Sequence, residues 1–362
     1  MSGGIENFLH DLTIAQKEMG AEPVVLVHNL EPFRKTARET WEDVEVIRAA
    51  SFGSALYTPI SPVFPFWLRK LFKHKPDLIH VHMPNPSAFW LLNMAQDVPV
   101  VIHWHSDVIA QASERALKTA YHFYHLFEKM LLDKAAAVIA TSRDYLDSSP
   151  VLKDYVHKCH VIPLGLNPDR LKCYGSSFKK GKKFLIFSAG RFAGYKGFEY
   201  LIQSMKDIPD SLLVIAGEGK FFRDSLRLID DLELGNRIKL TGYVSPGELC
   251  GLMNKCDVFC LPSVERTEAF GLVLLEAMYF AKPLVTTKIP GSGVNWVNQA
   301  GVTGLHVPPR DSIALAGAIK TLRNNDTLRQ RMGINSVNRF NENFHITKVA
   351  EKIHQIYKYL VH

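Results

Sequence analysis

Short runs of β-branched and other apolar residues alternate with amphipathic helical patterns along the whole chain. This alternation is typical of βαβ units, in which helices connect parallel strands. In the first half we predict strands at residues 23–30, 43–49, 77–83, 98–104, 135–141 and 160–164. In the second half we predict strands at residues 184–189, 212–216, 238–241, 258–261, 284–286 and 305–307. Each half is therefore expected to form an α/β domain with its own doubly wound, Rossmann-like sheet.

The chain has 362 residues, more than one hydrophobic core usually accommodates, so two domains are expected. Turn-forming residues after the strand at 160–164, followed by a polar stretch at 175–183, mark the boundary. We expect an N-terminal domain at 1–166, a C-terminal domain at 167–344 and a terminal helix at 345–362. The three- and four-residue spacing of apolar side chains gives that helix one apolar face. It can belong to either domain, including by crossing back to the first.

The net charge of +7 favours anionic partners such as nucleotides, phosphates or acidic lipids. The sequence has no zinc-finger spacing, aromatic RNA-binding signature or dense basic run, so no nucleic-acid partner is expected. The five cysteines are scattered and contain no CxxC pair, which indicates buried reduced thiols. No apolar run reaches the roughly 18 residues of a spanning helix, and no signal segment is present. We therefore expect the chain to work in the reducing cytoplasm.

Residues 256–278 combine a buried strand, a polar loop and the start of a helix near Ala269. The first amides of a helix have no intrahelical partner, so the backbone at Phe270, Gly271 and Leu272 predicts an anion site. Gly271 lets a phosphate approach the backbone closely. Glu268 and Glu276 are eight positions apart and can contact different parts of one ligand.

Arg191 and Lys196 follow the predicted strand at 184–189 and precede the next helix. Two fixed cations suit a diphosphate leaving group, because negative charge develops on it as its bond breaks. The next strand ends in a Gly217-Glu218-Gly219 turn, in which we interpret Glu218 as a turn residue.

The spacing from Glu268 to Glu276 resembles the EX7E signature of family 4 of the retaining nucleotide-sugar glycosyltransferases, which have the GT-B fold. Segments 103–107, 190–197 and 217–219 supply the family's other motifs in the same order, covering nearly the whole chain. The resemblance implies two Rossmann-like domains that face each other across a cleft. It also implies transfer of a mannose- or glucose-type hexose from a nucleotide-diphosphate sugar to a glycan or lipid-linked acceptor. The expected setting is bacterial surface-polysaccharide synthesis, such as O-antigen or capsule, with no cofactor.

The resemblance also assigns roles to individual residues. Arg191 and Lys196 would hold the diphosphate, Glu268 the sugar hydroxyls and Glu276 the ribose hydroxyls. The remaining donor-side positions are Gly3, Gly4, Gly217, Gly219, Tyr243, Val244, Phe270, Gly271 and Leu272. Among them, Tyr243 and Val244 would lie near the base, and the loop at Gly3 and Gly4 would close on the donor phosphate or acceptor.

His80 with His82, and His103 with His105, each share one strand face because side chains alternate. A four-histidine metal site is conceivable, but the resemblance implies metal independence and the sequence has no DxD motif. We therefore expect no metal, and we interpret His80, His82 and His103 as satisfied core or rim residues. By resemblance, His105 hydrogen-bonds the donor sugar or acceptor, and Asp107 is a candidate acceptor contact.

The resemblance implies retention of the anomeric configuration. Because no carboxylate nucleophile is evident, we favour a same-face displacement in which the departing phosphate takes the acceptor proton.

Residues 64–75 mix aromatic side chains with a basic cluster. Such a stretch can lie on an anionic membrane at the inner face of the plasma membrane, where lipid-linked acceptors would be found. The alternative is a helix that packs on its own sheet with a solvated basic face.

Other functions remain open. A nucleotide-sugar 2-epimerase shares the fold, and a non-catalytic glycosyltransferase-like subunit is a different kind of alternative. A phosphorylase would need a pyridoxal-phosphate lysine, for which there is no signature. A dinucleotide oxidoreductase would need a GxGxxG after a strand, and none is present.

The loop at Gly3 and Gly4 resembles one that follows a first strand, yet no strand precedes it. In a doubly wound sheet that strand is central, and its loss would leave backbone groups unpaired. We therefore expect Met1 to be an internal or misassigned start, with roughly 10 to 20 residues before it. The alternative is a sheet that closes up around the missing strand.

Overall fold

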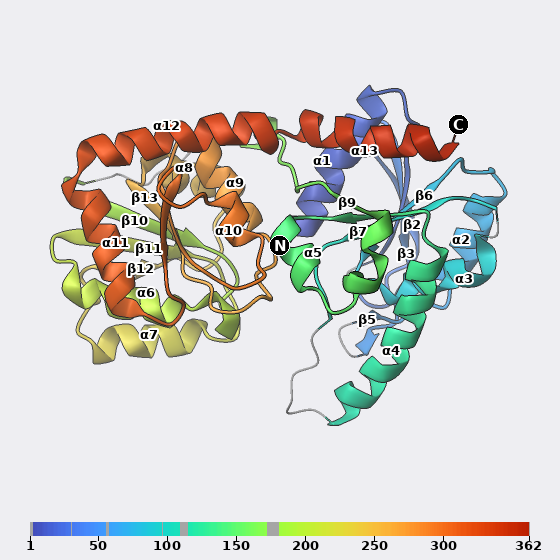
Figure 1. Cartoon of the computed structure of the whole chain (residues 1–362). Coiled ribbons are helices and arrows are strands. Elements are labelled where there is room, and N and C mark those ends of the chain that lie inside the picture. Colours follow the sequence, from blue (N-terminus) through green and yellow to red (C-terminus); the bar gives the residue numbers. More distant parts are fainter. Residues whose placement is uncertain are drawn as a thin grey trace. The chain divides into compact units, whose positions relative to one another are not determined.

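The computed structural model describes residues 3–29, 31–55, 58–95, 97–108, 115–171 and 181–361. It divides into two compact units (Figure 1). We call Pro163–Lys348, with which the described residues Gly3 and Gly4 are grouped, the C-terminal unit, and Ile5–Ile162 together with Val349–His362 the N-terminal unit.

The C-terminal unit contains a six-stranded parallel sheet in the order β12-β11-β10-β13-β14-β15. All six strands predicted for this half are confirmed, each to within one residue at either end. They are β10 (Phe184–Ala189), β11 (Ser211–Ala216), β12 (Ile238–Leu240), β13 (Val258–Leu261), β14 (Leu284–Thr287) and β15 (Gly304–Val307). The order reverses between β10 and β13, as in a Rossmann fold.

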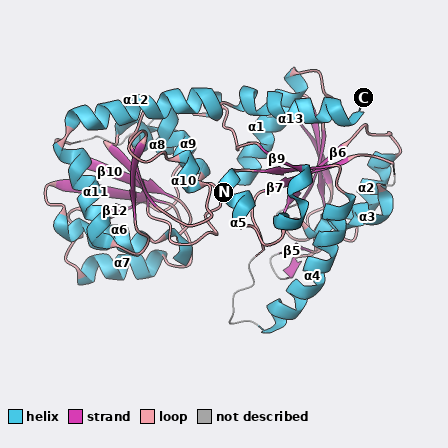
Figure 2. Cartoon of the chain, viewed as in Figure 1, coloured by secondary structure: helices cyan, strands magenta, loops and turns pink. Residues whose placement is uncertain are grey.

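Helices flank this sheet (Figure 2). They are α6 (Phe198–Ser204), α7 (Phe222–Asp231), α8 (Pro246–Lys255), α9 (Leu272–Tyr279), α10 (Val294–Val297), α11 (Ser312–Asn324) and α12 (Asp326–Asn343). The apolar side chains between the helices and the sheet are buried. Ile186 and Leu213 of the sheet share one core with Leu201 of α6 and Ile319 of α11. The strands are apolar nearly throughout, because a parallel sheet is covered on both faces.

The N-terminal unit has two main sheets instead of the single one expected. One has the order β1-β3-β2 and the other β6-β7-β8-β9. The six predicted strands are confirmed as β1 (Val24–His28), β3 (Val44–Ala49), β6 (Ile79–Met83), β7 (Val100–Trp104), β8 (Ala137–Ala140) and β9 (Cys159–Val161). No ladder joins β1 to β6 in the part of the chain that is described, so the sheet does not close up there. Two short strands, β4 (Ser54–Ala55) and β5 (Thr58–Pro59), pair with each other.

Strand β2 (Ala37–Trp41) was not predicted. It pairs with β3 in an antiparallel hairpin whose turn residues Glu42 and Asp43 both have positive φ, of 47° and 64°. A two-residue turn of this handedness matches the twist of the strands it connects.

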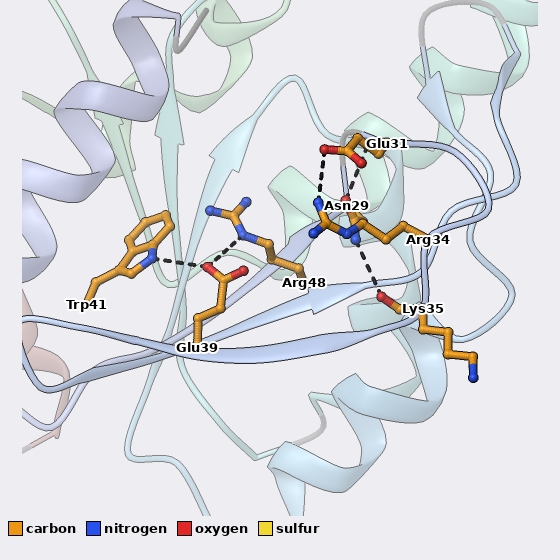
Figure 3. Close-up of polar contacts among 7 residues, drawn as sticks. All are labelled: Asn29, Glu31, Arg34, Lys35, Glu39, Trp41 and Arg48. Carbon is orange, nitrogen blue, oxygen red and sulfur yellow. Dashed lines mark hydrogen bonds and ion pairs between the residues drawn. The ribbon is translucent and has the colours of Figure 1, made fainter.

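Side-chain hydrogen bonds to Glu39 connect residues on one face of the hairpin (Figure 3). Glu39 Oε2 accepts hydrogen bonds from Arg48 Nε at 3.0 Å and from Trp41 Nε1 at 3.2 Å. The hydrogen bond from Arg48 lowers the pKa of Glu39. Asn29, which follows β1, accepts from the Glu31 amide and so shapes the loop that leads to β2.

The N-terminal unit also contains α1 (Gly4–Glu18), α2 (Phe64–Phe72), α3 (Leu91–Met94), α4 (Arg115–Lys134), α5 (Arg143–Ser148) and α13 (Ile346–Val361). The terminal helix α13 packs on α1. Gln16 Nε2 donates to the Ala350 carbonyl at 3.0 Å, and Gln16 Oε1 lies 3.0 Å from His354 Nδ1. Val349, Ala350 and Ile353 on its apolar face are fully buried.

Cys250, Cys256 and Cys260 are buried, Cys159 is half-buried, and no disulfide joins cysteines within the described ranges; Cys173 lies outside them. Among the helices that the structure describes, none combines the length and the hydropathy needed to cross a bilayer.

Candidate functional site

The loops after β10 and β13 leave the C-terminal sheet at the point where its strand order reverses. Open α/β sheets bind ligands at this position, beyond the carboxyl ends of the strands. Two of the predicted site residues, Lys196 and Glu268, come from these two loops.

Lys196 and Glu268 form a buried ion pair. Lys196 ends the short 3-10 helix η4 (Gly194–Lys196), and its Nζ lies 2.5 Å from Glu268 Oε2. Ser263 Oγ donates to the same carboxylate oxygen at 2.8 Å. Lys196 is only 7% exposed and Glu268 only 9%, so the pair is shielded from bulk water. Sequence reasoning found both residues but not their direct contact.

The backbones of the two loops are also connected. The Val264 amide donates to the Tyr195 carbonyl at 2.7 Å, and the Ser292 hydroxyl donates to the Glu268 carbonyl. Glu268 is thus fixed through both its side chain and its main chain. A group held in this way loses little entropy when a ligand binds.

Helix α9 begins at Leu272, three residues later than the sequence suggested. Its N-cap, Gly271, is left-handed with φ 80°, and no side chain caps the helix. The Leu274 amide donates to the Gly271 carbonyl at 2.8 Å, so the amides of Leu272 and Val273 are the ones that an anion could bind. Phe270 is buried and packs on Phe344, and Glu276 lies half-buried in the second turn of the helix.

The glycine turn after β11 is hydrogen-bonded to the loops after β10 and β12. The Gly217 amide donates to the Gly242 carbonyl at 2.8 Å, and the Phe192 amide donates to the Glu218 carbonyl at 2.8 Å. A Cβ on Gly217 would lie 1.9 Å from the Gly190 carbonyl oxygen, so this position excludes any side chain. A Cβ on Gly219 would lie 2.5 Å from the Phe192 carbonyl oxygen, which also leaves no room for a side chain.

A cavity of about 570 Å³ opens at the carboxyl ends of β11 and β12. It is lined by Glu218, Gly219, Lys220, Phe222, Arg223, Leu240, Thr241 and Gly242. The cationic side chains of Lys220 and Arg223 lie next to the aromatic ring of Phe222. This combination suits a ligand with a flat ring and a phosphate group. Sequence reasoning located this region through Gly219 and Tyr243 but missed Lys220, Phe222 and Arg223. Their position just after a strand-end glycine turn is the signal that could have identified them.

Three other predicted donor-side residues lie on the surface near these features. Tyr243 is 55% exposed, and its amide donates to Glu218 Oε1 at 3.4 Å; Val244 follows it and is half-buried. Arg191 is exposed at the carboxyl end of β10.

Of the remaining predicted residues, Gly4 packs against the start of α9, since a Cβ there would lie 2.9 Å from Leu272 Cδ1. Gly4 is the first residue of α1, directly after Gly3. Asp107 Oδ1 accepts from Trp104 Nε1 at 2.9 Å and from Ser149 Oγ at 2.7 Å. These bonds give Asp107 a structural role in fixing the loop after β7.

His105 directly follows β7 and is 4% exposed. Its Nε2 lies 2.9 Å from Nδ1 of His82. Burial lowers the pKa of His82 to about 4, and it lowers the pKa values of His80, His103 and His105 well below the usual range. The four rings are therefore neutral at physiological pH.

The interpretation of His80 and His103 as satisfied residues is contradicted at three of their four ring nitrogens, the exception being Nδ1 of His80, which lies 2.5 Å from the Tyr357 hydroxyl. Nε2 of His80 and both ring nitrogens of His103 are buried, and none has a hydrogen-bond partner among the described residues. The expectation failed because alternation specifies which face a strand residue occupies and does not specify its partner.

Known proteins share this architecture and sequence. The family described as Glycosyltransferase Family 4 matches residues 2–170, and that described as Glycosyl transferases group 1 matches residues 174–339. The chain is 32% identical over 355 residues to O-antigen chain mannosyltransferase C of Escherichia coli, covering 94% of this chain and 90% of that protein. It is 29% identical over 279 residues to D-rhamnosyltransferase WbpZ of Pseudomonas aeruginosa, covering 74% and 70%.

Solved structures show the same fold. Sucrose-phosphate synthase from Thermosynechococcus elongatus superimposes with a TM-score of 0.79 at 23% identity, covering 99% of this chain and 94% of that one. WaaG, a glycosyltransferase of lipopolysaccharide biosynthesis, gives a TM-score of 0.70 at 17% identity, covering 99% and 96%. The chain therefore belongs to the family 4, group 1 glycosyltransferases and is a transferase of the GT-B fold.

Proposed function

We propose that the chain is a retaining hexosyltransferase that takes a mannose- or glucose-type sugar from a nucleotide-diphosphate donor. The acceptor is a glycan or lipid-linked glycan in surface-polysaccharide synthesis. The Escherichia coli relative, an O-antigen chain mannosyltransferase, supports this setting. The observation that carries the proposal is the buried Lys196–Glu268 pair next to the uncapped start of α9.

In this proposal, positive groups around the pair bind the donor diphosphate. Lys196, Arg191 and the first amides of α9 stabilise the negative charge that develops on the leaving group. Lys196 transfers part of its interaction from Glu268 to phosphate when the donor binds. Glu268 is still held by Ser263 and can then accept hydrogen bonds from sugar hydroxyls.

The nucleoside occupies the neighbouring region. Glu276 of α9 binds the ribose hydroxyls, and the base lies near Tyr243 and Val244, next to the cavity after β11 and β12. Gly217 and Gly219 let the backbone approach the donor. Solved GT-B relatives whose names record bound UDP and UDP-glucose support a nucleotide-sugar donor.

We assign the N-terminal unit to the acceptor side. His105 would hydrogen-bond the donor sugar or acceptor, Asp107 would contact the acceptor, and the loop at Gly3 and Gly4 would close on the donor phosphate or acceptor. The departing phosphate takes the acceptor proton in a same-face displacement, so the carboxylates act as binding groups. The cations replace a divalent metal, and no cofactor is required.

We also propose that α2 contacts an anionic membrane. One of its faces packs into the fold, since Phe64 and Leu68 are buried. The other side carries Phe66, which is 64% exposed, together with the exposed basic residues Arg69, Lys70 and Lys73. An aromatic side chain among lysines and arginines suits the interface of acidic lipids.

Binding and transfer assays test the proposal together. Unfolding temperature is first measured with UDP, GDP, ADP and dTDP, because a ligand at 100 times its dissociation constant adds about 2.7 kcal/mol of stability. The matching nucleotide sugars are then incubated with lipid-linked glycan acceptors, and products are identified by mass spectrometry. We expect an acceptor extended by one hexose. A C2-epimerised donor without transfer would indicate the epimerase, and binding without turnover would indicate the non-catalytic subunit.

A further inference from the structure

Four imidazole rings gather on one face of β6 and β7 in the N-terminal unit. His82 pairs in register with His103, and their ring centroids are 5.2 Å apart. His80 lies 4.6 Å from His82 and 5.4 Å from His103, measured between ring centroids. One ring nitrogen from each of these three residues lies within 4.8 Å of the other two.

The polar atoms of this cluster are not satisfied by the described part of the chain. Nε2 of His80, Nδ1 of His105 and both ring nitrogens of His103 are buried without a partner there. Phe8 of α1 packs edge-on against His103, with centroids 5.2 Å apart, and closes the cluster with an apolar ring. Buried polar groups normally have partners, so these nitrogens are positioned to bind one.

We propose that His80, His82 and His103 bind one divalent transition-metal ion of the zinc type. Neutral imidazole nitrogens are ligands that zinc, copper and nickel prefer. A tetrahedral zinc ion with Zn–N bonds near 2.0 Å holds its nitrogens roughly 3.4 Å apart. The rings must therefore turn about their side-chain bonds, and their ligating nitrogens must approach one another by up to about 1.4 Å from the present 4.8 Å.

Two outer hydrogen bonds fit this arrangement. The Tyr357 hydroxyl of α13 lies 2.5 Å from His80 Nδ1, and His105 Nε2 lies 2.9 Å from His82 Nδ1. In metal sites the second nitrogen of a ligating histidine is usually held in this way, which fixes ring orientation. The contact of Tyr357 also leaves the buried Nε2 of His80 for the ion.

The ion would have a structural role. It would join β6 and β7 at the place where α1 and α13 cover the sheet through Phe8 and Tyr357. The inference rests on the histidines alone and does not depend on the proposed donor chemistry.

The proposal is tested by measuring the metal content of the untagged protein. The protein is folded with zinc present, and loosely bound metal is then removed with a chelator. We expect about one tightly held zinc ion per chain by mass spectrometry of the elements. Cobalt refolded into the site should give the intense visible bands of four-coordinate Co²⁺. His80→Asn and His103→Asn should lose the ion, whereas His122→Asn, at an exposed position of α4, should keep it.

Tyr357→Phe provides a test that does not remove a ligand. It should weaken zinc binding by about 10- to 100-fold while the protein stays folded. Wild-type protein that takes up no zinc, cobalt or nickel on folding would overturn the proposal. Full metal content in both His80→Asn and His103→Asn would overturn it as well. If those variants fail to fold, the cobalt spectrum of the wild type and the affinity of Tyr357→Phe decide the question.

Discussion

In the proposed site, Lys196 of the Lys196–Glu268 pair contributes both to the stability of the fold and to binding of the donor diphosphate. A buried ion pair is stable only while both charges are present, since removing one partner leaves the other charge without compensation. A donor diphosphate needs the same lysine as a cation. Substitution of Lys196 should therefore affect stability and turnover through different mechanisms.

We predict that Lys196→Ala and Arg191→Ala each lower kcat by about 10²- to 10³-fold, the usual loss when one preorganised electrostatic group is removed. Arg191 is exposed, so its variant should unfold like the wild type. Lys196→Ala should still fold but should lose about 3 kcal/mol of unfolding free energy, because Glu268 is left buried. Steady-state transfer rates and urea unfolding check both effects.

Two further variants separate the causes. Lys196→Met combined with Glu268→Gln leaves no unpaired buried charge, so it should recover stability and remain slow. Lys206→Ala removes an exposed lysine of the same unit and should change neither property. Near-normal turnover in Lys196→Ala and Arg191→Ala would remove both residues from the diphosphate site.

Glu128 of α4 gives a pH-dependent prediction. Burial raises the pKa of this carboxyl from 4.5 to about 6, despite its contact with His125 at 3.1 Å. The native state then binds the proton more tightly than the unfolded state. The associated stability is fully present below pH 4.5 and is lost as the pH rises through 6.

Glu128→Gln should therefore raise the unfolding free energy at pH 8 by about 2 kcal/mol, from the shift of the carboxyl pKa. At pH 4 the gain should disappear. Urea titrations at both pH values measure it, with Glu351→Gln on the exposed side of α13 as the control. An equal effect at both pH values would show that the pKa of Glu128 is not raised.

Among the elements, the glycine turn after β11 imposes the strictest steric requirement. Gly217 has φ 137°, and an added Cβ would lie 1.9 Å from the Gly190 carbonyl oxygen. We predict that Gly217→Ala lowers the unfolding free energy by more than about 3 kcal/mol, because strain and a backbone clash act together. Gly235→Ala is the matched control, since a Cβ there meets nothing within 4 Å. Calorimetry of both variants measures the difference, and similar unfolding temperatures would contradict the prediction.

Helix α2 tests the membrane proposal. Vesicles containing acidic lipid should bind the protein at low salt and release it at high salt, since attraction of lysine and arginine falls off within a Debye length. Replacing Arg69, Lys70 and Lys73 by Gln should weaken binding to those vesicles. The control replaces the exposed Lys153, Lys206 and Lys239 by Gln, an equal change in charge. Equal loss in both variants would show a non-specific effect of net charge.

These elements also show how far sequence reasoning extends. Strands such as β10 and β13 were predictable because their residues are apolar nearly throughout and a turn signal follows each of them. Strand β2 was missed because three consecutive polar residues stand at the centre of its ARETW sequence, so it shows no polar–apolar alternation. The start of α9 was displaced because a left-handed glycine, Gly271, ends the preceding loop.

Contacts between residues that are far apart in the chain could not be predicted from the sequence. Lys196 and Glu268 are 72 positions apart, and only the parallel pairing of β10 with β13 brings their loops together. The same holds for Tyr357 and His80, which are 277 positions apart. Motifs identified the participants because each motif is local, whereas their pairing depends on the topology of the sheet.

At the scale of the whole molecule, the remaining question is whether transfer requires a divalent cation. In the proposed site, Lys196, Arg191 and the uncapped start of α9 supply positive charge where the diphosphate would bind. Side chains and helix amides of this kind can replace a metal as the stabiliser of a leaving phosphate. The first half contributes no acidic pair of the DxD type that would hold magnesium on a nucleotide.

We therefore predict that the intact enzyme keeps its transfer rate in excess EDTA. The same samples should be analysed for zinc, because an ion held by the buried histidines would stay bound while exchangeable magnesium is removed. Activity that is lost in EDTA and restored by magnesium would place a catalytic cation at the donor diphosphate. Activity that is lost together with zinc, and restored only by zinc, would instead make transfer depend on the histidine cluster. The first result would contradict catalysis by protein charges alone, whereas the second would show that the active fold depends on the structural ion.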